Sequence, residues 1–304
     1  MTDRQEVLPQ RISARIKDVG GVPVSRALPV KERRQIGTWC FLDHAGPAVF
    51  KGDDGMKVGP HPHIGLQTFT WMLEGEVLHR DSLGSEQIIR PGQVNLMTAG
   101  RGITHTEDSA GRNARLHAAQ LWIALPPADS TIAPRFDHYP DLPVWHHDQV
   151  SFTLLTGEYG DHRSPVLHFS PLIGMDLLAQ QATQTTLDTR PDFEYGLFVL
   201  EGQLTYRGEV YTANELVYVG EGLSSVTLTL MKGSRLLLLG GTPVQERIMM
   251  WWNFVGYDVQ TLQQAVSDWN NGDIWFGTVE NDPREPLPAP SYPASRIPPV
   301  TGNS

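Results

Sequence analysis

The sequence predicts an all-β protein with two barrel-type or sandwich-type domains in tandem and one helix near the C-terminus. Three observations lead to this prediction. Short runs of β-branched and aromatic residues recur along the chain. The 304 residues include 29 glycines and 23 prolines, a composition typical of a chain with many turns. Two short segments also recur in the same order in both halves, which indicates an internal duplication.

The strand-type runs are short and are bounded by Gly, Pro, Asn or Asp, as expected for an all-β domain. The clearest of them are Thr68–Leu73, Ile88–Arg90, Gln93–Met97, Ala119–Leu125, Ser151–Leu155, Gly196–Leu200, Leu216–Val219 and Ser225–Leu230.

Helical periodicity first appears after residue 257. Asp258 is a suitable N-cap, apolar residues recur at helical spacing at Leu262, Val266 and Trp269, and Gly272 ends the segment. The pattern predicts one helix of about 12 residues.

The internal repeat is carried by two pairs of segments. Phe69–Gly75 reads FTWMLEG and Leu197–Gly202 reads LFVLEG, with an offset of 127 between their final glycines. Ala99–Thr104 reads AGRGIT and Val219–Ser224 reads VGEGLS, with an offset of 120. The two halves should therefore share one plan, and the first half should carry an insertion of about seven residues.

Proline-rich stretches divide the chain. The segment Pro126–Pro143 contains five prolines and lies near the midpoint, and seven further prolines lie between Pro283 and Pro299. We therefore expect a first domain over residues 1–135, a second over 136–290 and a proline-rich tail over 291–304.

Composition excludes several classes of function. The chain has 24 basic and 34 acidic residues, a net charge of −10, whereas direct nucleic-acid binding needs a basic face. Its single cysteine, Cys40, permits neither an intrachain disulfide nor a cysteine-based zinc site. No apolar run is long enough to span a membrane, and the N-terminus has no signal-peptide pattern. We expect a cytoplasmic protein.

Two short motifs carry candidate metal ligands. His61 and His63 are two residues apart, as are His105 and Glu107. In a strand, residues i and i+2 point to the same face, about 6–7 Å apart, so each pair can supply two ligands to one ion. Three imidazoles and a carboxylate suit Fe, Ni, Cu, Mn or Zn better than Ca²⁺ or Mg²⁺.

The repeat supplies an internal control for these motifs. Offsets of 127 and 120 place none of the four ligand types at the corresponding positions of the second half, which hold Asp188, Arg190, Ser225 and Thr227. A fold requirement would apply to both halves. The restriction of the ligands to the first half therefore favours a functional metal site there and a structural role for the second half.

These residues lie within longer segments that resemble one known family. The segments are Arg26–Pro47, Pro60–Gly84, Pro91–Glu107, Gln120–Pro126, Arg235–Val244 and Ile248–Gly256. They resemble the pirin family of the cupin superfamily, and in particular its bacterial branch. The resemblance implies two jelly-roll type cupin domains, with one metal in the first. Its ligands fall on His61, His63, His105 and Glu107, the set that the spacing also indicates.

The resemblance also implies a function. Some bacterial pirins act as quercetin 2,3-dioxygenases, which cleave flavonols with O₂, so a flavonol-like or other chelating enol substrate is expected. Iron(II) is the expected metal, with Ni, Cu, Mn, Co and Zn as alternatives, and Glu107 is a candidate base. The alternative is a non-enzymatic regulator of transcription, in which the metal state controls binding to a protein partner.

Gln67 is a second candidate catalytic residue. Many cupins have a glutamate four residues after the second histidine of the motif, where this chain has Gln67. If one strand face carries positions 61, 63, 65 and 67, and Gly65 introduces no bulge, the amide faces the metal cavity. His79, Arg80 and Asp81, by contrast, are interpreted as turn residues with a surface ion pair.

Overall fold

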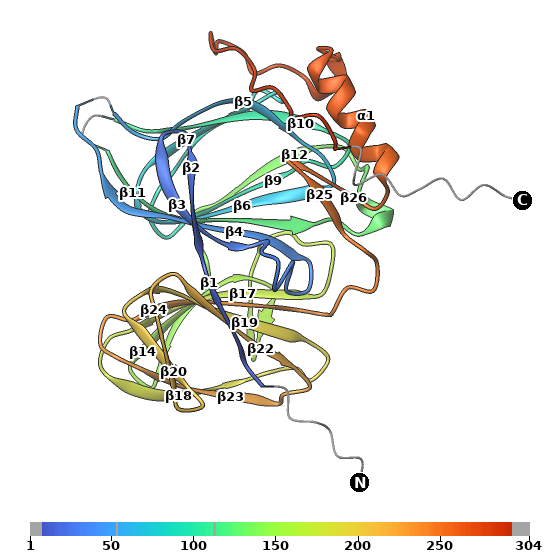
Figure 1. Cartoon of the computed structure of the whole chain (residues 1–304). Coiled ribbons are helices and arrows are strands. Elements are labelled where there is room, and N and C mark those ends of the chain that lie inside the picture. The colour runs from blue at the N-terminus through green and yellow to red at the C-terminus, as the bar shows by residue number, and fades with distance from the viewer. Residues whose placement is uncertain (1–7, 53, 112–113, 294–304) are drawn as a thin grey trace, which may run out of the picture.

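The protein is described from a computed structural model that covers residues 8–52, 54–111 and 114–293. Two β-barrels lie one above the other, and a single α-helix packs against the upper one (Figure 1). Each barrel consists of one seven-stranded and one four-stranded sheet. The prediction of an all-β protein with two similar domains and one helix is confirmed.

The first barrel is built mainly from residues 15–139. Its larger sheet has the order β12 (Arg135–Tyr139), β9 (Val94–Thr98), β6 (Leu66–Gly75), β11 (Arg115–Ala124), β4 (Trp39–Val49), β3 (Val22–Leu28) and β2 (Arg15–Val19). Its smaller sheet has the order β5 (Lys57–His63), β10 (Ile103–Ser109), β7 (Val77–Asp81) and β8 (Glu86–Ile89).

The second barrel repeats this arrangement. Its larger sheet has the order β1 (Gln10–Ser13), β22 (Glu215–Glu221), β19 (Glu194–Glu201), β24 (Arg235–Gly241), β17 (Leu172–Ala179), β14 (Val150–Thr156) and β13 (Val144–His147). Its smaller sheet has the order β18 (Thr183–Asp188), β23 (Ser225–Leu230), β20 (Gln203–Tyr206) and β21 (Glu209–Thr212). Strand for strand the two orders match, as the sequence repeat predicts.

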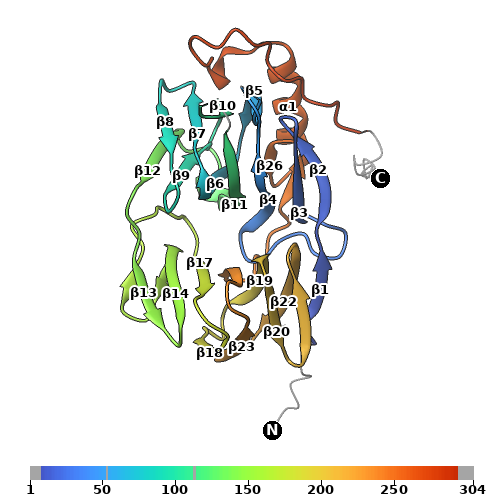
Figure 2. The ribbon, with the colours of Figure 1, turned by 90° about the vertical axis from the view of Figure 1, so that its left-hand side faces the viewer.

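The ends of the chain cross between the barrels. The N-terminal strand β1 pairs with β22 of the second barrel. The residues after β24 return to the first barrel through β25 (Met249–Trp251), β26 (Phe254–Gly256), α1 (Val259–Asn270) and a 3₁₀ turn at Ile274–Phe276 (Figure 2). Strand β1 therefore pairs within the second barrel, and β26 pairs with the first barrel through Phe254 and Ile64, so the barrels are not strictly consecutive stretches of the chain. The change of barrel falls between Tyr139 and Val144, inside the predicted proline-rich boundary.

The remaining regular elements lie in loops. They are a 3₁₀ turn at Pro127–Asp129 and the short hairpin β15 (Glu158–Tyr159) and β16 (His162–Arg163).

Helix α1 forms where the sequence predicts it. The side chain of Asp258 accepts a hydrogen bond from the backbone N–H of Thr261 (2.7 Å), which satisfies one free donor of the first turn. The helix buries Leu262, Ala265 and Val266. These side chains pack in a cluster with Ile64 and Phe254, so the helix covers the first barrel beside the end of β5.

The barrels meet through an apolar core. Leu121 and Phe69 from the first barrel and Phe198 and Leu237 from the second belong to one buried cluster. Trp39 spans the boundary, because its indole N–H lies 3.2 Å from the carbonyl oxygens of both Ile173 and Gly240. An interface of this kind holds the barrels as one unit, since apolar burial drives their association.

The two barrel interiors differ. Large apolar side chains, among them Leu228, Tyr211 and Leu238, fill the second barrel. The first barrel contains a cavity of about 410 Å³ between its two sheets. One barrel is thus a packed core and the other encloses a space of the size expected for a small-molecule ligand.

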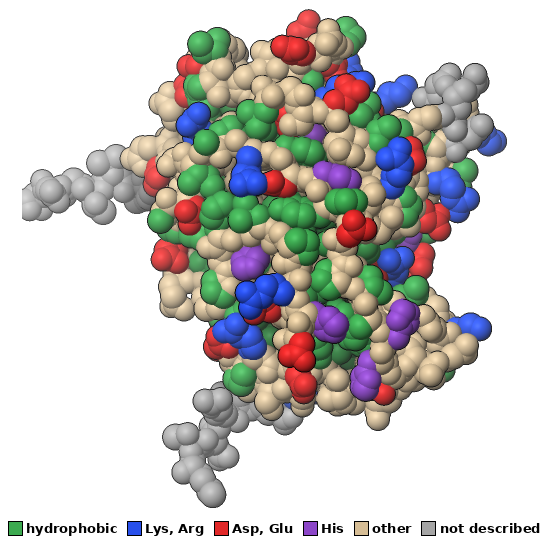
Figure 3. All heavy atoms as spheres, turned by 180° about the vertical axis from the view of Figure 1, so that it is seen from behind, with side chains coloured by type: hydrophobic (Ala, Val, Ile, Leu, Met, Phe, Trp, Pro, Cys, Tyr) green, Lys and Arg blue, Asp and Glu red, His purple; other side chains and the backbone are tan. Residues whose placement is uncertain are grey.

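Charged side chains of both signs are dispersed over the face seen in Figure 3. The face carries no continuous basic area, as expected from the net charge of −10. Within the described ranges, no helix has the length and apolar character needed to cross a membrane.

Gly65 separates β5 from β6 and sets the direction of the chain between them. Its φ is +69°, a left-handed conformation that strains residues with a Cβ. A Cβ at this position would also overlap the carbonyl oxygen of Val255. The turn at Gly65 therefore interrupts the strand directly after the HPH motif.

We predict that Gly65→Ala destabilises the fold far more than Gly84→Ala. Both glycines have positive φ, +69° and +84°, but a Cβ at Gly84 meets nothing within 4 Å. Gly84→Ala should cost about 1–2 kcal/mol in the free energy of unfolding from backbone strain alone. Gly65→Ala adds a steric overlap with backbone. Urea denaturation measures the free energy of unfolding of each variant. An equal loss of stability in Gly65→Ala and Gly84→Ala would contradict the close approach of Gly65 to Val255.

Candidate metal centre

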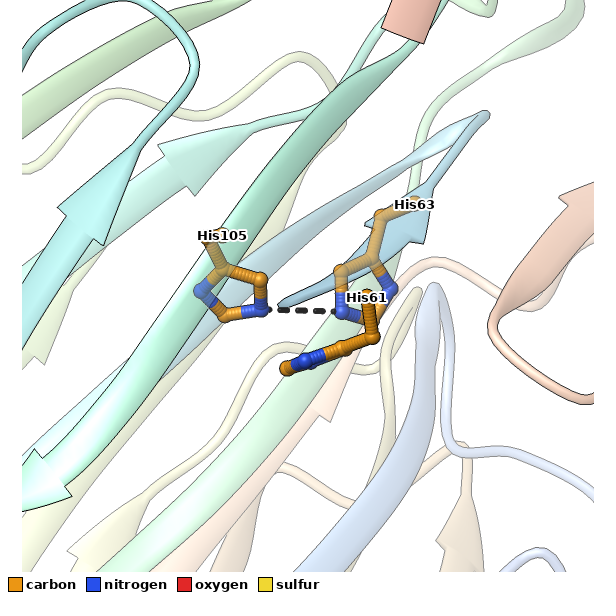
Figure 4. A group of neighbouring side chains, drawn as sticks. All are labelled: His61, His63 and His105. Atoms are coloured by element: carbon orange, nitrogen blue, oxygen red, sulfur yellow. Dashed lines mark hydrogen bonds between the residues drawn. The ribbon is translucent and has the colours of Figure 1, made fainter. Parts of the chain in front are cut away.

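Three histidines converge in the first barrel. His61 and His63 lie on β5 and His105 lies on the neighbouring β10, where His105 is paired in register with His61. Their ligand nitrogens all lie within 4.8 Å of one another (Figure 4). All three are buried, with exposures of 6%, 1% and 1%. Three imidazoles so arranged form a triad able to hold a metal ion.

Backbone carbonyls fix the ring orientation of the two histidines on β5. The Nδ1 of His61 lies 2.9 Å from the carbonyl oxygen of Gly59, and the Nδ1 of His63 lies 3.1 Å from that of Asn253. A carbonyl oxygen only accepts, so each Nδ1 must carry the proton and donate it. Both Nε2 atoms then present lone pairs to the centre of the triad, the arrangement usual for ligating histidines.

A second histidine and a carboxylate orient His105. The Nδ1 of His105 lies 3.4 Å from the Nδ1 of His79, and the Nε2 of His79 lies 3.0 Å from a carboxylate oxygen of Asp81. Because the carboxylate only accepts, His79 donates from Nε2 and accepts at Nδ1, and His105 donates from its own Nδ1. The Nε2 of His105 is then free for a metal, as in His61 and His63.

This chain of contacts corrects the interpretation of His79 and Asp81 as a surface turn pair. Both are buried, with exposures of 4% and 2%, and the ring of His79 stacks on Phe136 at 4.3 Å. Asp81 does bind the turn, through the N–H groups of Leu83 and Ser85. The sequence contains a signal for this burial, because Val77, His79 and Asp81 alternate and so share one face of a strand. In the structure this strand, β7, pairs with β10.

The triad fits a bound cation. The Nε2 atoms of His63 and His105 lie 3.1 Å apart, the contact drawn as a dashed line in Figure 4. With both Nδ1 atoms protonated and the rings neutral, two lone pairs face each other, which is favourable only with a cation between them. Two cis ligands at metal–nitrogen bonds of ~2.1 Å would be separated by about 3.0 Å.

Burial keeps the histidines available as ligands. It lowers the pKa of His61 to about 4 and the pKa values of His63 and His105 well below the ordinary value. The cause is desolvation, which disfavours the charged imidazolium. All three rings are therefore neutral near pH 7, so protons do not compete with a metal there.

Glu107 lies next to the triad along β10 but outside the group of three. A bulge displaces the pairing, so His105 lies opposite His61 while Glu107 lies opposite Val58. Glu107 lines the same cavity as the histidines. Burial, with a smaller effect of Asp108, raises the pKa of its carboxyl to about 7. Its role as a fourth ligand remains a proposal.

Gln67 does not face the cavity, contrary to the expectation from strand alternation. Its neighbours Thr68 and Thr70 line the cavity, whereas the amide nitrogen of Gln67 donates to the hydroxyl of Thr98 (2.9 Å). The physical reason is Gly65, whose left-handed backbone ends β5 and changes the phase of the following strand. Gln67 instead lies between the barrels, 3.4 Å from the carbonyl oxygen of Leu167.

The second barrel offers no matching site. Asp188 and Ser225 are paired in register, as His61 and His105 are, but they lie on the outer face of their sheet, and the neighbouring Leu187 and Val226 face the interior. The side chains of Asp188, Arg190, Ser225 and Thr227 are exposed. In the part of the chain that the structure describes, the histidine triad is the one group of three potential metal ligands.

The cavity extends from the triad across the barrel. The opposite wall is lined by side chains from β3, β4, β6 and β11, including Arg26, Phe41 and Trp122. Asp18 and Leu287 are exposed members of the lining, so the cavity reaches solvent beside β2 and the C-terminal segment.

Comparisons with known proteins agree with this architecture. The family model named Pirin matches residues 21–123, and the model named Pirin C-terminal cupin domain matches residues 174–275. The chain belongs to the pirin family. Its two barrels correspond to the two domains that the family models describe.

Individual relatives cover nearly the whole chain. A Pseudomonas aeruginosa protein named "Putative quercetin 2,3-dioxygenase PA1205" is 53% identical over 96% of this chain and 93% of its own length. A pirin-like protein of Caulobacter vibrioides is 35% identical over 90% of this chain and 97% of its own. A crystal structure titled quercetin 2,3-dioxygenase from Acinetobacter baumannii superposes with a TM-score of 0.92 at 48% identity, covering 94% of this pirin and 96% of that chain.

We predict that His79→Phe weakens metal binding. The substitution leaves an apolar ring beside Phe136 but removes the acceptor that orients His105, and loss of such a partner typically costs 10–100-fold in metal affinity. His117→Phe is the matched control, because His117 is equally buried (2%) but contacts His44 at the barrel interface. Competition titration with a chelator measures both. Unchanged affinity in His79→Phe would contradict the orienting role.

Proposed function

We propose that this pirin is a metal-dependent dioxygenase of the quercetin 2,3-dioxygenase type, acting with O₂ on a flavonol-like or other chelating enol. The observation that carries the proposal is the triad itself: three buried, neutral imidazoles present Nε2 atoms to one point on the wall of a 410 Å³ cavity. The names of the relatives from Pseudomonas and Acinetobacter support the same chemistry.

We propose His61, His63, His105 and Glu107 as the ligands of one divalent ion, with iron(II) as the metal. A mixed set of imidazoles and one carboxylate suits iron, and it is also compatible with Ni, Cu, Mn, Co and Zn. Such an ion supplies a Lewis acid that lowers the pKa of a chelating hydroxyl and brings the enolate and O₂ together.

The protein's own groups then have distinct tasks. The walls of the cavity exclude bulk water from the substrate and hold it in one orientation. The Glu107 carboxyl, when detached from the metal, can accept the proton of the substrate hydroxyl. Burial raises its pKa to about 7 in the metal-free site, and a base is most effective when its pKa is close to the working pH. Gln67 has no task in this proposal, since its side chain lies on the far face of β6.

We predict that the wild-type protein, purified without a histidine tag and loaded with iron(II), consumes O₂ when given a flavonol. His63→Ala should lose stoichiometric metal and reduce turnover by at least about 100-fold, because the metal then lacks one ligand. The matched control is Arg190→Ala, the corresponding position of the second barrel, where an exposed arginine pairs with Asp192. It should retain both metal and turnover.

Elemental analysis and an oxygen electrode give the two readouts. Turnover by fully metal-free protein would contradict the metal-dependent mechanism. Stoichiometric metal without flavonol-dependent O₂ uptake would favour the alternative, a regulator whose metal state controls binding to a protein partner.

A further inference from the structure

The wall opposite the triad is ordered in rows that run across the strands. Residues paired in register on β6, β11 and β4 form an aromatic row of Thr68, Trp122 and Phe41. Two residues further along these strands, and on β3, lies a polar row of Thr70, Gln120, Asp43 and Arg26. The next row is apolar and consists of Met72, Ala118, Ala45 and Val24.

The aromatic row begins at the triad and leads to the arginine. The ring of His63 lies 5.1 Å from that of Trp122, which stacks on Phe41 at 4.0 Å. The guanidinium of Arg26 lies over the other end of this stack, 4.4 Å from the ring centre of Phe41. The cation is therefore part of the same cavity wall as the metal-binding face.

The arginine keeps one donor group available. Its Nε and Nη2 donate to the two carboxylate oxygens of Asp43, each at 2.7 Å. Its Nη1 has no hydrogen-bond partner among the residues that the structure describes, and the side chain lines the cavity. Each oxygen of Asp43 already accepts one of these bonds, so the donor that the pair keeps available to whatever fills the cavity is the Nη1 group of Arg26.

Strand geometry gives the scale of this arrangement. Gln120 precedes Trp122 by two residues, about 7 Å along the strand, and Arg26 lies two strands further across, so the Cα atoms of Arg26 and Trp122 are roughly 12 Å apart. The guanidinium lies beyond the stacked rings of Trp122 and Phe41 as seen from His63, so a ligand that chelates at the triad and reaches Arg26 must extend past both rings. That distance corresponds to at least two fused or linked rings.

The second barrel shows that the fold does not require the polar row. The offset of 127 takes Thr70 to Leu197, and the register then gives the corresponding row as Leu197, Leu238, Met175 and Leu154. All four side chains are buried, with exposures of 0–1%. An ion pair in a barrel interior carries a desolvation cost that an apolar pair avoids. The polar row is present only in the barrel that holds the triad, which points to a ligand.

We propose that Arg26, held in place by Asp43, is a specificity-determining residue that binds an oxygen acceptor at the far end of a planar, multi-ring enol. The near end of that molecule occupies the triad, so the inference rests on the proposed function. It adds the requirement that the substrate carry an acceptor, such as a carboxylate or phenolic oxygen, on the side remote from its chelating oxygens.

The test compares two ligands that differ only at the far end, 3-hydroxychromone and its 7-carboxylate. Dissociation constants are measured on protein loaded with Zn²⁺, so that binding is observed without turnover. The wild type should bind the carboxylate at least about ten-fold more tightly, the value of one hydrogen bond to a charged group. No preference in the wild type would overturn the inference.

The variant Arg26→Gln/Asp43→Asn removes both charges and leaves no unpaired buried carboxylate. It should bind the parent chromone within about three-fold of the wild type and lose the preference for the carboxylate. A second variant, Arg26→Leu/Asp43→Met, copies the residues that the second barrel packs at these positions, Leu154 and Met175. It should behave in the same way. Retained preference in either folded variant would overturn the inference.

The matched control is Arg235→Gln/Asp176→Asn. Arg235 and Asp176 form a similar ion pair (2.9 Å), with side-chain exposures of 21% and 3%, against 26% and 5% for Arg26 and Asp43, but they lie outside the cavity. This variant should keep the full preference for the carboxylate. If it loses that preference, the change in the Arg26 variants reflects reduced stability, and the inference is overturned. Oxygen uptake by the iron-loaded wild type is recorded separately. Its absence, with ligand preference intact, would contradict the proposed function and leave the recognition by Arg26 standing.

Discussion

The feature on which the rest of the site depends is the orientation of three neutral imidazoles. Carbonyl oxygens hold His61 and His63, and the pair His79–Asp81 holds His105, so that every Nδ1 donates and every Nε2 presents a lone pair. Burial lowers the pKa values of all three rings and prevents protonation from relieving the crowding of these lone pairs near neutral pH. A cation at the centre would remove the conflict, so the triad of the first barrel is able to hold a metal ion.

Duplication explains how one barrel acquired this role. Both barrels have the same strand order in their larger and smaller sheets. The second barrel fills its interior with apolar side chains and supplies a broad interface to the first. The interior of the first barrel contains a cavity in place of that apolar packing. The C-terminal segment returns to it and provides Asn253, which orients His63.

Much of this arrangement can be predicted from the sequence, because it follows from local rules. Alternation in a strand is enough to pair His61 with His63, and the capping residue Asp258 is enough to begin α1. The predictions that the structure corrects depend on long-range geometry, which the local sequence does not determine. A single left-handed glycine, Gly65, turns Gln67 away from the cavity, and burial of His79 depends on which strand lies beside β10. The exchange of chain ends between the barrels has no local signal either.

We expect one metal ion to bind to the Nε2 atoms of His61, His63 and His105. Anomalous X-ray diffraction from crystals of the metal-loaded protein, recorded on both sides of the metal's absorption edge, tests it most directly. We expect one peak per chain, about 2.1 Å from each of the three Nε2 atoms, and no peak in the second barrel. A peak bound through Nδ1, or one located away from the triad, would contradict it.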